Sequence, residues 1–365
     1  MNQQPRPQRR PRRGRLVVAA FLLAVAYLLL WPVGADPRAW QPPTTPPLAG
    51  ANPVERDFST IDLLAQGVCN GPEDIAIDSQ GRLYAGMLDG RIMRFDHDGT
   101  GAELFADTGG RPLGLDFDND GHLIVADAYK GLLRLDGHGA VTVLATEQGR
   151  VPFMLTDDVD VAPSGMIYFT DASSKYALDD YTTDFIEQRG SGRLMRFDPA
   201  TSTTELLRGD LNFANGVAVS PDESFVLVNE TARYRIHRVW LSGPRAGESE
   251  LFIDNLPGFP DGVSCNGADR FWVAIVSPRS PVLDMAHPHP WIKRAMLRLP
   301  RFMLPAARPD ACVIGLDLEG QAVTTLRDPS GRSFAFITSV EEYDGVLYLG
   351  SLSRDALARI ASPSE

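Results

Sequence analysis

The chain contains little cysteine: only Cys69, Cys265 and Cys312 occur among its 365 residues. The three lie far apart and form no Cys-x-x-Cys pair or other metal-binding spacing, which excludes a cysteine-based metal or redox motif. In an oxidising compartment one pair could form a disulfide, and three buried thiols are the alternative. Cysteine therefore leaves the compartment of the protein open.

Basic residues are scarce once the amino terminus is passed. The chain has 35 Lys and Arg against 47 Asp and Glu, a net charge of −12, yet six arginines precede the first acid, Asp36. Residues 36–365 therefore hold 29 basic and 47 acidic residues, a net charge of −18. Nucleic-acid binding needs a basic face, so that function is excluded. A content of 44% hydrophobic residues excludes a disordered chain.

Charge is absent from one long stretch, residues 16–35. About twenty apolar residues can cross a bilayer as a helix, and a basic tail, here residues 1–15, favours a cytoplasmic amino terminus. We therefore expect a single-pass transmembrane signal-anchor helix with the rest of the chain on the extracytoplasmic side. The alternative is cleavage near Ala35 and secretion. The apolar region of a signal peptide is usually shorter, about 7–15 residues, which favours the anchor.

Residues 36–56 contain the proline-rich sequence QPPTTPPLAGANP. Such a sequence cannot hold a regular hydrogen-bonded ladder and is typical of a semi-rigid spacer. We expect it to join the anchor to a folded domain at residues 57–362.

The folded domain repeats itself. Six β-rich runs follow turn residues, as in GRLYAG, GHLIVAD and GMIYFTD. Their equivalent apolar positions, 40, 44, 59, 45 and 76 residues apart, are Leu83, Leu123, Ile167, Val226, Phe271 and Leu347. Insertions near residues 173–192 and 277–310 account for the longer intervals. Strand-only repeats of roughly 40–50 residues predict an all-β, six-bladed β-propeller, whereas a β-sandwich would not explain the period.

The register of these repeats predicts a site on the propeller axis. In each repeat, one residue near the start of the preceding strand is equivalent to those of the other repeats. It lies ten residues before the aligned apolar position, or eleven in the fourth repeat. These residues are Glu73, Leu113, Asp157, Asn215, Asp261 and Ile337. The first strand of each propeller blade lines the central channel, so we expect the six to form a ring.

Four ring positions carry oxygen-bearing side chains: Glu73, Asp157, Asn215 and Asp261. Such a set suits a hard cation such as Ca²⁺, which binds about six to eight oxygens. Without a cation, crowded carboxylates repel one another and some take up protons. The alternative is that these are ordinary turn residues, which are frequent in β proteins. Their shared register favours the metal site.

Longer motifs carry a family resemblance. GPEDIAID, GRPLGLDFD, IYFTDASSKY, FANGVAVSPDESFVLVNET, LPGFPDGV and EEYDGVLYLGS resemble the strictosidine-synthase-like family, and within it the adipocyte plasma membrane-associated protein group. The likeness covers roughly residues 57–360. The family belongs with the SMP-30, gluconolactonase and paraoxonase propellers of the calcium-dependent phosphotriesterase superfamily. The resemblance therefore implies a six-bladed propeller and metal-dependent ester chemistry.

The resemblance also implies roles for the ring residues. Hydrolytic relatives hold a catalytic calcium with a Glu, one or two Asn and an Asp. The matching residues are Glu73, Asp157, Asn215 and Asp261, with Asp157 in place of the Asn of many relatives. Asp261 would be the nucleophile or general base. A second, structural calcium of paraoxonase-like members would use Asp74 and Asp158.

Two departures limit what the resemblance implies. Strictosidine synthases proper use a late Glu in their condensation, and Thr338 stands near that position, although Glu341 and Glu342 are close by. The catalytic His of paraoxonases has no counterpart in VADAYKG. A strictosidine-type condensation and a His-assisted mechanism are therefore not expected.

These observations predict a calcium-dependent hydrolase of esters or lactones, of lactonase or arylesterase type, acting on a small molecule. Ca²⁺ would polarise the substrate carbonyl, and Asp261 would attack it or activate a water. The alternative is a non-catalytic, membrane-tethered propeller in which the metal is structural.

The insertions carry further expectations. Residues 281–305 mix apolar and basic side chains, which predicts a membrane-surface segment or a lid over the channel, with packing on the propeller side as the alternative. His287 and His289 are expected to be exposed rather than metal-bound. The acidic third-blade insertion predicts a rim loop at the substrate entrance. DFDNDG, residues 116–121, predicts a hairpin turn because a calcium loop would end in Glu.

Overall fold

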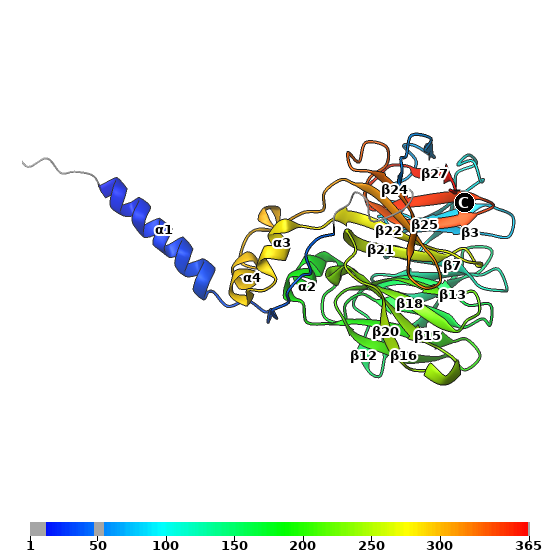
Figure 1. Ribbon diagram of the computed structural model, residues 1–365, viewed down its shortest axis with the longest axis horizontal. Helices are drawn as coiled ribbons and strands as arrows, with labels where there is room; N and C mark the ends of the chain where they lie inside the picture. Colours follow the sequence, from blue (N-terminus) through cyan, green and yellow to red (C-terminus); the bar gives the residue numbers. More distant parts are fainter. Residues whose placement is uncertain (1–11, 47–54, 364–365) are drawn as a thin grey trace, which may run out of the picture.

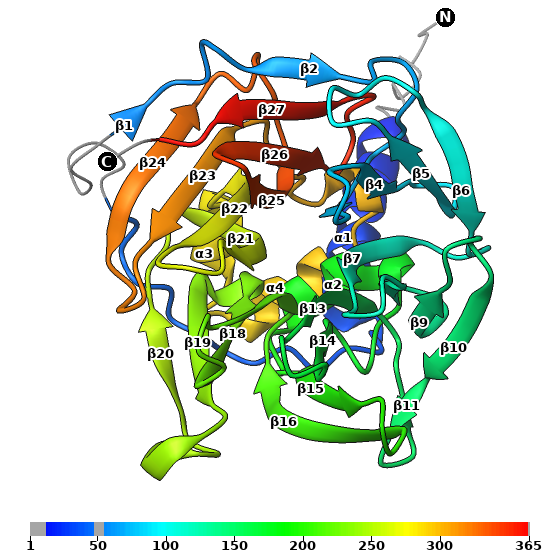
Figure 2. The ribbon, with the colours of Figure 1, turned by 90° about the vertical axis from the view of Figure 1, so that its right-hand side faces the viewer.

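The short apolar runs and turn glycines of the sequence fold into six antiparallel sheets around a central channel (Figure 2). The chain is described by a computed structural model that covers residues 12–46 and 55–363. The predicted six-bladed propeller is confirmed. The first strand of each blade lies at the channel and its later strands lie progressively outward, so four short strands and their turns set the repeat length.

Blades one to three follow the sequence from the channel outward. Blade one consists of β3 (Ile75–Ile77), β4 (Leu83–Gly86), β5 (Arg91–Phe95) and β6 (Glu103–Asp107). Blade two consists of β7 (Pro112–Phe117), β8 (Leu123–Asp127), β9 (Gly131–Leu135) and β10 (Val141–Ala145). Blade three consists of β13 (Thr156–Val161), β14 (Ile167–Asp171), β15 (Gly192–Asp198) and β16 (Thr203–Leu211). The hairpin of β11 (Glu147–Gln148) and β12 (Val151–Pro152) precedes blade three.

Blades four to six complete the ring. Blade four consists of β17 (Ala214–Val219), β18 (Phe225–Glu230), β19 (Arg235–Trp240) and β20 (Ser249–Ile253). Blade five consists of β21 (Gly258–Cys265), β22 (Phe271–Pro278), β23 (Ala311–Leu316) and β24 (Ala322–Asp328), with β1 (Glu55–Arg56) added in parallel. Blade six consists of β25 (Ile337–Tyr343), β26 (Val346–Ser351), β27 (Leu357–Ala361) and β2 (Asp62–Leu64). An outer strand from the start of the propeller thus closes the last blade.

The core lies between neighbouring blades. The second strand of a blade has sheet on both sides, so β4, β8, β14 and β18 are buried along their whole length. Between blades one and two, for example, Ile92 packs in one cluster with Leu115, Val125 and Leu133. Each such side chain contributes about 1.5–3 kcal/mol on full burial, and the apolar runs of the sequence therefore specify the blade interfaces.

A β-bulge interrupts each inner strand of blades two to six at the equivalent place. The register of β13 against β14 shifts between Thr156 and Val159, and that of β17 against β18 shifts between Ala214 and Val217. The shifts in β7, β21 and β25 correspond. A bulge directs two consecutive side chains to the same face. It therefore exposes a pair of residues per blade to the channel.

The bulge corrects one predicted ring position. In blade six the shift lies between Ile337 and Val340, so Thr338 stands where Asp157 and Asn215 stand in their blades. Thr338 lines the channel, whereas Ile337 is fully buried in the core. The prediction of Ile337 was wrong by one residue because a fixed step along the sequence does not follow the bulge.

The apolar run near the amino terminus forms helix α1 (Arg12–Leu30), which extends away from the propeller (Figure 1). Arg298 satisfies carbonyls at its carboxyl end, donating to the oxygens of Leu28 at 2.7 Å and Trp31 at 2.5 Å. Among the residues that the structure describes, no helix is both long enough and apolar enough to cross a bilayer. Residues 1–11 of the predicted tail and residues 47–54 of the predicted spacer lie outside the described residues.

Both insertions form helices over one end of the channel (Figure 1). The third-blade insertion contains η1 (Leu178–Asp180) and α2 (Tyr181–Glu187). The fifth-blade insertion contains α3 (Pro281–Ala286), α4 (Pro290–Met296) and η4 (Arg301–Met303). Proline at the first helical position starts α3 and α4, and Ser280 caps α3 by accepting from the Leu283 N–H at 3.4 Å.

The segment after α1 is hydrogen-bonded to these helices. The Arg38 N–H donates to the Glu187 carbonyl at 2.9 Å, and the buried Lys293 Nζ donates to the Arg38 carbonyl at 2.6 Å. The Trp40 N–H donates to the His287 carbonyl at 3.0 Å. Residues 36–44 therefore connect the two insertions.

His287 corrects a further prediction. Its ring lies 5.2 Å from that of Trp40 and is buried, whereas His289 is exposed as expected. Trp40 is distant in the sequence, so local composition could not indicate the burial. The three cysteines are free thiols, and Cys69 and Cys312 are buried while Cys265 is half-buried.

Candidate functional site

The inner strands bring four predicted site residues together at the channel. Glu73 lies just before β3, and Asp157, Asn215 and Asp261 lie in β13, β17 and β21. All four line both a polar channel and an apolar cavity next to it. They face the same channel because each stands at the bulge of its own blade, or at the equivalent place before β3. We call these four residues the ring.

Acids at the ends of second strands hold the loops that lead to this ring. Asp127 Oδ1 accepts the Arg111 N–H at 3.1 Å, and Asp171 Oδ1 accepts the Leu155 N–H at 3.0 Å. Glu230 is bonded in the same way to the Asn212 N–H at 2.9 Å. The last residue of each motif VAD, FTD and VNE is this acid, and it fixes the backbone of the loop that comes before an inner strand.

Asp261 is fixed by two amide side chains. The Asn215 Nδ2 group donates to Asp261 Oδ1, and the buried Asn229 Nδ2 group donates to the Asp261 carbonyl at 2.5 Å. Gly216 allows this approach, because a Cβ there would lie 2.5 Å from the Asp261 carbonyl oxygen. One oxygen of the Asp261 carboxyl group is thus oriented by an amide at the channel.

Arg111 is a site residue that the sequence analysis missed. Its Nη2 donates to Glu73 Oε2 at 2.7 Å, and its Nη1 donates to the Gly86 carbonyl at 3.2 Å. The guanidinium is buried and lies at the cavity floor. The sequence could have indicated Arg111, because it stands two residues before Leu113, the blade-two residue equivalent to Glu73 and Asp157.

The ring carboxyl groups repel one another. Burial raises the pKa of Glu73, Asp157 and Asp261 above that of an ordinary carboxyl group. The charge of Glu73 raises the pKa of both aspartates further, and Asp261 adds to the effect on Asp157. The Arg111 ion pair opposes the rise at Glu73, and the Asn215 hydrogen bond opposes it at Asp261. One guanidinium therefore faces three acids.

This donor set fits a hard cation. Three carboxyl groups and one amide oxygen are ligands that Ca²⁺ accepts, and a buried excess of negative charge is costly without a counter-charge. Arg111 supplies one positive charge and holds Glu73 by one oxygen. A cation at the ring would compete with that ion pair for the Glu73 carboxylate.

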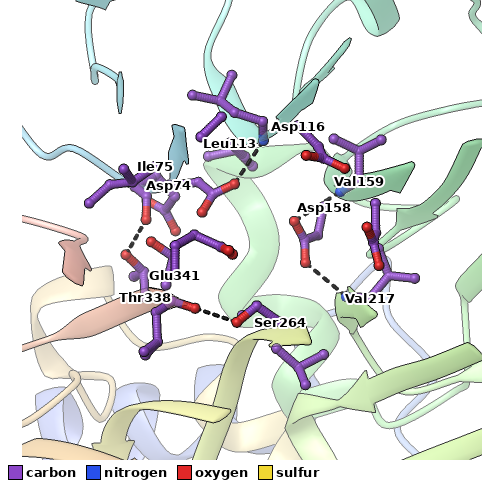
Figure 3. Close-up of a pocket in the computed structure, with 18 of the residues that line it drawn as sticks. Asp74, Ile75, Leu113, Asp116, Asp158, Val159, Val217, Ser264, Thr338 and Glu341 are labelled. Atoms are coloured by element: carbon purple, nitrogen blue, oxygen red, sulfur yellow. Dashed lines mark hydrogen bonds between the residues drawn. The ribbon is translucent and has the colours of Figure 1, made fainter. Parts of the chain in front are cut away.

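Asp74 and Asp158 directly follow Glu73 and Asp157 in the sequence, and both line the channel (Figure 3). Asp74 Oδ2 accepts the Leu115 N–H, and Asp158 Oδ2 accepts the Val217 N–H, both at 2.8 Å. Each bond crosses to the next blade. Burial raises the pKa of Asp74 to about 7 and that of Asp158 well above its ordinary value, with the charge of Asp74 adding at Asp158. Each of the two acids therefore links neighbouring blades through a hydrogen bond.

Four channel acids were not anticipated: Asp116, Asp160, Glu341 and Glu342. Asp116 Oδ2 accepts the Val161 N–H at 2.7 Å, and Asp160 Oδ2 accepts the Val219 N–H at 2.6 Å. Asp116, Asp160 and Glu341 each stand three residues after the equivalent bulge position of their blades, which is Leu113, Asp157 or Thr338. The register therefore indicated Asp116 and Asp160, and it indicates Glu341 once the bulge of blade six is known.

An apolar cavity of about 400 Å³ lies over the ring. Its walls come from the inner strands and from both insertions. They include Leu88, Leu113, Tyr181, Phe185, Phe213, Phe259, Leu283 and Leu304. The rings of Phe185 and Phe213 pack at 4.6 Å, and those of Phe185 and Phe259 pack at 5.6 Å. Its size lies within the roughly 300–1,000 Å³ of small-molecule sites.

DFDNDG forms the expected hairpin turn. Gly121 donates to the Asp118 carbonyl at 3.0 Å, and Asp118 Oδ1 accepts the N–H groups of Asp120 and His122 at 3.0 and 2.8 Å. Ligand atoms of Asp118, Asp120 and His122 lie within 4.8 Å of one another. The hydrogen bonds of the turn account for this grouping.

Family models match two segments of the chain. A strictosidine synthase model matches residues 157–244, and a strictosidine synthase-like, N-terminal model matches residues 56–95. Protein STRICTOSIDINE SYNTHASE-LIKE 6 of Arabidopsis thaliana is 36% identical over 313 residues, which cover 84% of this chain and 83% of that protein. The chain belongs to the strictosidine-synthase-like family. The adipocyte plasma membrane-associated protein of Rattus norvegicus is 32% identical over 377 residues, covering 95% and 97%.

Solved structures show that this family member shares its fold with other propellers. A gluconolactonase from Xanthomonas campestris has a TM-score of 0.61 and 19% identity, covering 92% of this chain and 99% of that chain. A calcium-binding protein, regucalcin, from Agrobacterium tumefaciens has a TM-score of 0.60 and 15% identity, covering 86% and 98%. The resemblance predicted from the sequence motifs is therefore confirmed at the level of family and fold.

Proposed function

We propose that this strictosidine-synthase-like protein is a calcium-dependent hydrolase of esters or lactones. The observation that carries the proposal is an apolar cavity whose floor holds Glu73, Asp157, Asn215 and Asp261. Buried acids with raised pKa at a cavity floor are typical of sites that perform chemistry. The structural likeness to a gluconolactonase and to a calcium-binding regucalcin supports the same assignment.

Asp261 is the catalytic carboxylate in this proposal. The Asn215 amide orients one of its oxygens and leaves the other for the substrate or a water. Asp261 then removes a proton from a water that attacks the carbonyl carbon, or it attacks that carbon itself and water later hydrolyses the acyl-enzyme. In either case the acyl C–O bond breaks and its oxygen leaves as the alcohol. Phe185, Phe213 and Phe259 line the cavity and exclude bulk water from the reacting group.

Glu73, Asp157, Asn215 and Asp261 would hold the metal. Bound Ca²⁺ supplies a Lewis acid for the substrate carbonyl oxygen and for the charge that develops on it. Arg111 orients the Glu73 carboxylate at the floor through its ion pair. A second, structural calcium at Asp74 and Asp158 stays a prediction, because their bonds to neighbouring blades already explain both residues.

Substitution of the catalytic carboxylate tests the proposal. Asp261→Asn should lower kcat/KM on lactones and aryl esters by roughly 10²–10⁴-fold while the melting temperature stays close to that of the wild type. The matched control is Asp269→Asn, an exposed aspartate of the same blade. Full activity of the Asp261→Asn variant would contradict the assignment.

A non-catalytic propeller with a structural metal is the second candidate. The bonds of Asp74 and Asp158 to backbone groups of other blades favour a structural rather than a catalytic role for channel acids, because they hold neighbouring blades together. In that case a chelator would lower the melting temperature, and no ester or lactone would be hydrolysed with or without calcium. A strictosidine-type condensation is not supported, since Thr338 has no carboxyl group and donates to the Glu73 carbonyl at 2.6 Å.

We further propose that α1 associates the protein with a membrane, with the propeller on the extracytoplasmic side. The exposed apolar side chains of α1 support this, as does the similarity to the adipocyte plasma membrane-associated protein. Protease protection in sealed vesicles should shield the propeller and leave the amino terminus accessible. A mature chain that begins near residue 36 would instead indicate cleavage and secretion.

A further inference from the structure

The fifth-blade insertion exposes five apolar side chains, which we together call the apolar outer face. Phe302 is 87% exposed, Met285 is 64% exposed and Trp291 is 63% exposed, and Val282 and Met303 are also exposed. These five residues lie within 22 positions of the sequence, on α3, α4 and η4. Clustered exposed apolar side chains indicate a binding surface, whereas single ones do not.

Exposed apolar residues on the blades contrast with this cluster. Leu104, Leu206 and Leu251 are exposed on the outer strands β6, β16 and β20, and Val141 and Val143 are both exposed on the outer strand β10. These four strands are separated around the propeller (Figure 2). The apolar outer face is therefore a feature of the insertion and not of the surface as a whole.

The same insertion builds a wall of the cavity. Leu283 of α3 lines the cavity, while Val282 and Met285 of the same helix point to solvent. After η4, Leu304 and residues 305–308 return to the cavity wall. Helix α3 thus presents one side chain to the cavity and two others to solvent.

Position and charge favour a lipid surface as the occupant. α1, with its exposed apolar side chains, leaves the molecule next to α4 (Figure 1), and Arg298 of the insertion binds the end of α1. Arg294 and Arg301 lie beside the apolar outer face and remain substantially exposed although each pairs with an aspartate. An apolar face with an exposed Trp and flanking arginines is typical of segments that lie in the headgroup region of a bilayer.

We infer that the apolar outer face docks on a phospholipid bilayer and holds the cavity wall against it. Val282, Met285, Trp291, Phe302 and Met303 enter the headgroup region, and Arg294 and Arg301 contact lipid phosphates. An apolar substrate dissolved in the bilayer then reaches the cavity without crossing water. This last step rests on the proposed hydrolase function, whereas the docking does not.

An environment-sensitive label tests the docking in the full-length chain. Phe302→Cys and, as the matched control, Val143→Cys are each labelled with a nitrobenzoxadiazole dye. Labelled wild-type protein gives the background from Cys265, the half-buried native thiol. The proteins are mixed with vesicles of phosphatidylcholine and phosphatidylglycerol, with and without nitroxide lipids. Because α1 is identical in both variants, only the depth of the label differs.

The label at position 302 should brighten several-fold on vesicles and be quenched by nitroxides near the headgroups, because docked segments lie roughly 5–10 Å into that region. The label at position 143 should do neither. Equal behaviour of the two labels would overturn the docking. Shielding of the label at 302 without lipid, increasing with protein concentration, would also overturn it and indicate a second copy of the chain as the occupant.

Activity separates the docking from substrate entry. Phe302→Ser combined with Met303→Ser should slow hydrolysis of a long-chain ester held in vesicles and leave that of a water-soluble short-chain ester unchanged. Equal rates of the variant and the wild type on the vesicle-bound ester would overturn the entry step. Absence of any hydrolysis by the wild type would contradict the proposed function, while the label experiment would still decide the docking.

Discussion

At the scale of single residues, the ring combines three acids with one buried cation. The pair of Arg111 and Glu73 is 2.7 Å long, with side-chain exposures of 3% and 13%. Removal of one partner from such a pair leaves an uncompensated buried charge, which costs far more than the pair itself contributes. Arg111 therefore stabilises the metal-free protein and restrains Glu73 at the same time.

Arg111→Met should separate these two effects. In chelator, the free energy of unfolding should fall by about 3–5 kcal/mol because Glu73 loses its counter-charge. In calcium, the melting temperature should rise by more than it does in the wild type, since Glu73 is free to bind the ion. Denaturant and thermal unfolding in both conditions measure the two effects.

Arg91→Met is the matched control, because Arg91 pairs with Asp89 at 2.9 Å on the exposed surface. Exposed pairs contribute roughly 0–1 kcal/mol, so this variant should unfold much as the wild type does. Equal destabilisation by the two substitutions would contradict the role assigned to Arg111.

At the scale of elements, the bulges of the inner strands determine which side chains reach the channel. They require close contact between blades, as at Gly216, where a Cβ would lie 2.5 Å from the Asp261 carbonyl oxygen and 2.6 Å from Asn229 Nδ2. A side chain at this position would therefore have to displace Asp261 or Asn229. The ring residues Asn215 and Asp261 can therefore come together only if residue 216 is glycine.

Gly216→Ala should displace the ring. Overpacking of this kind costs about 1–3 kcal/mol, and the shift of Asp261 should remove most hydrolytic activity as well. Gly209→Ala is the control, because a Cβ there would meet only a Leu206 methyl group at 4.0 Å. Thermal unfolding and ester hydrolysis of both variants test this, and wild-type behaviour of Gly216→Ala would contradict it.

The elements also show what the sequence could and could not indicate. The period of the apolar runs predicted six blades, and the register of Glu73, Asp157, Asn215 and Asp261 placed them at one channel, because both follow from local repetition. Thr338 was missed because a bulge shifts the step by one residue. Contacts made over long sequence distances, such as β2 closing blade six or Trp40 covering His287, leave no periodic signal.

At the scale of the whole molecule, the acidity of the propeller has a definite location. Acids from several blades meet in one channel, and burial raises the pKa of most of them, that of Asp74 to about 7. A folded-state pKa above the unfolded value means that the folded protein keeps protons that the unfolded chain has released. Stability from these groups is therefore lost as the pH rises.

The metal-free protein should accordingly become more stable as the pH falls from about 8 to 6.5. Calcium replaces the protons, so the rise in melting temperature that calcium causes should grow with pH. Below about pH 6.5 the buried His287 acts in the opposite direction, because burial lowers its pKa to about 3 and only the unfolded state then gains the proton. A calcium effect on melting temperature that does not change with pH would contradict this account.

The most direct test of the central claim is the rate of ester or lactone hydrolysis by the full-length protein during a chelator titration, followed by return of calcium. The account predicts that activity falls as calcium is removed, returns when it is restored, and is absent throughout in Asp261→Asn. Asp157→Asn should retain part of the calcium response, since an amide oxygen remains a calcium ligand. Hydrolysis that is unaffected by the chelator, or that persists in Asp261→Asn, would contradict the claim that the ring is a calcium-dependent catalytic site.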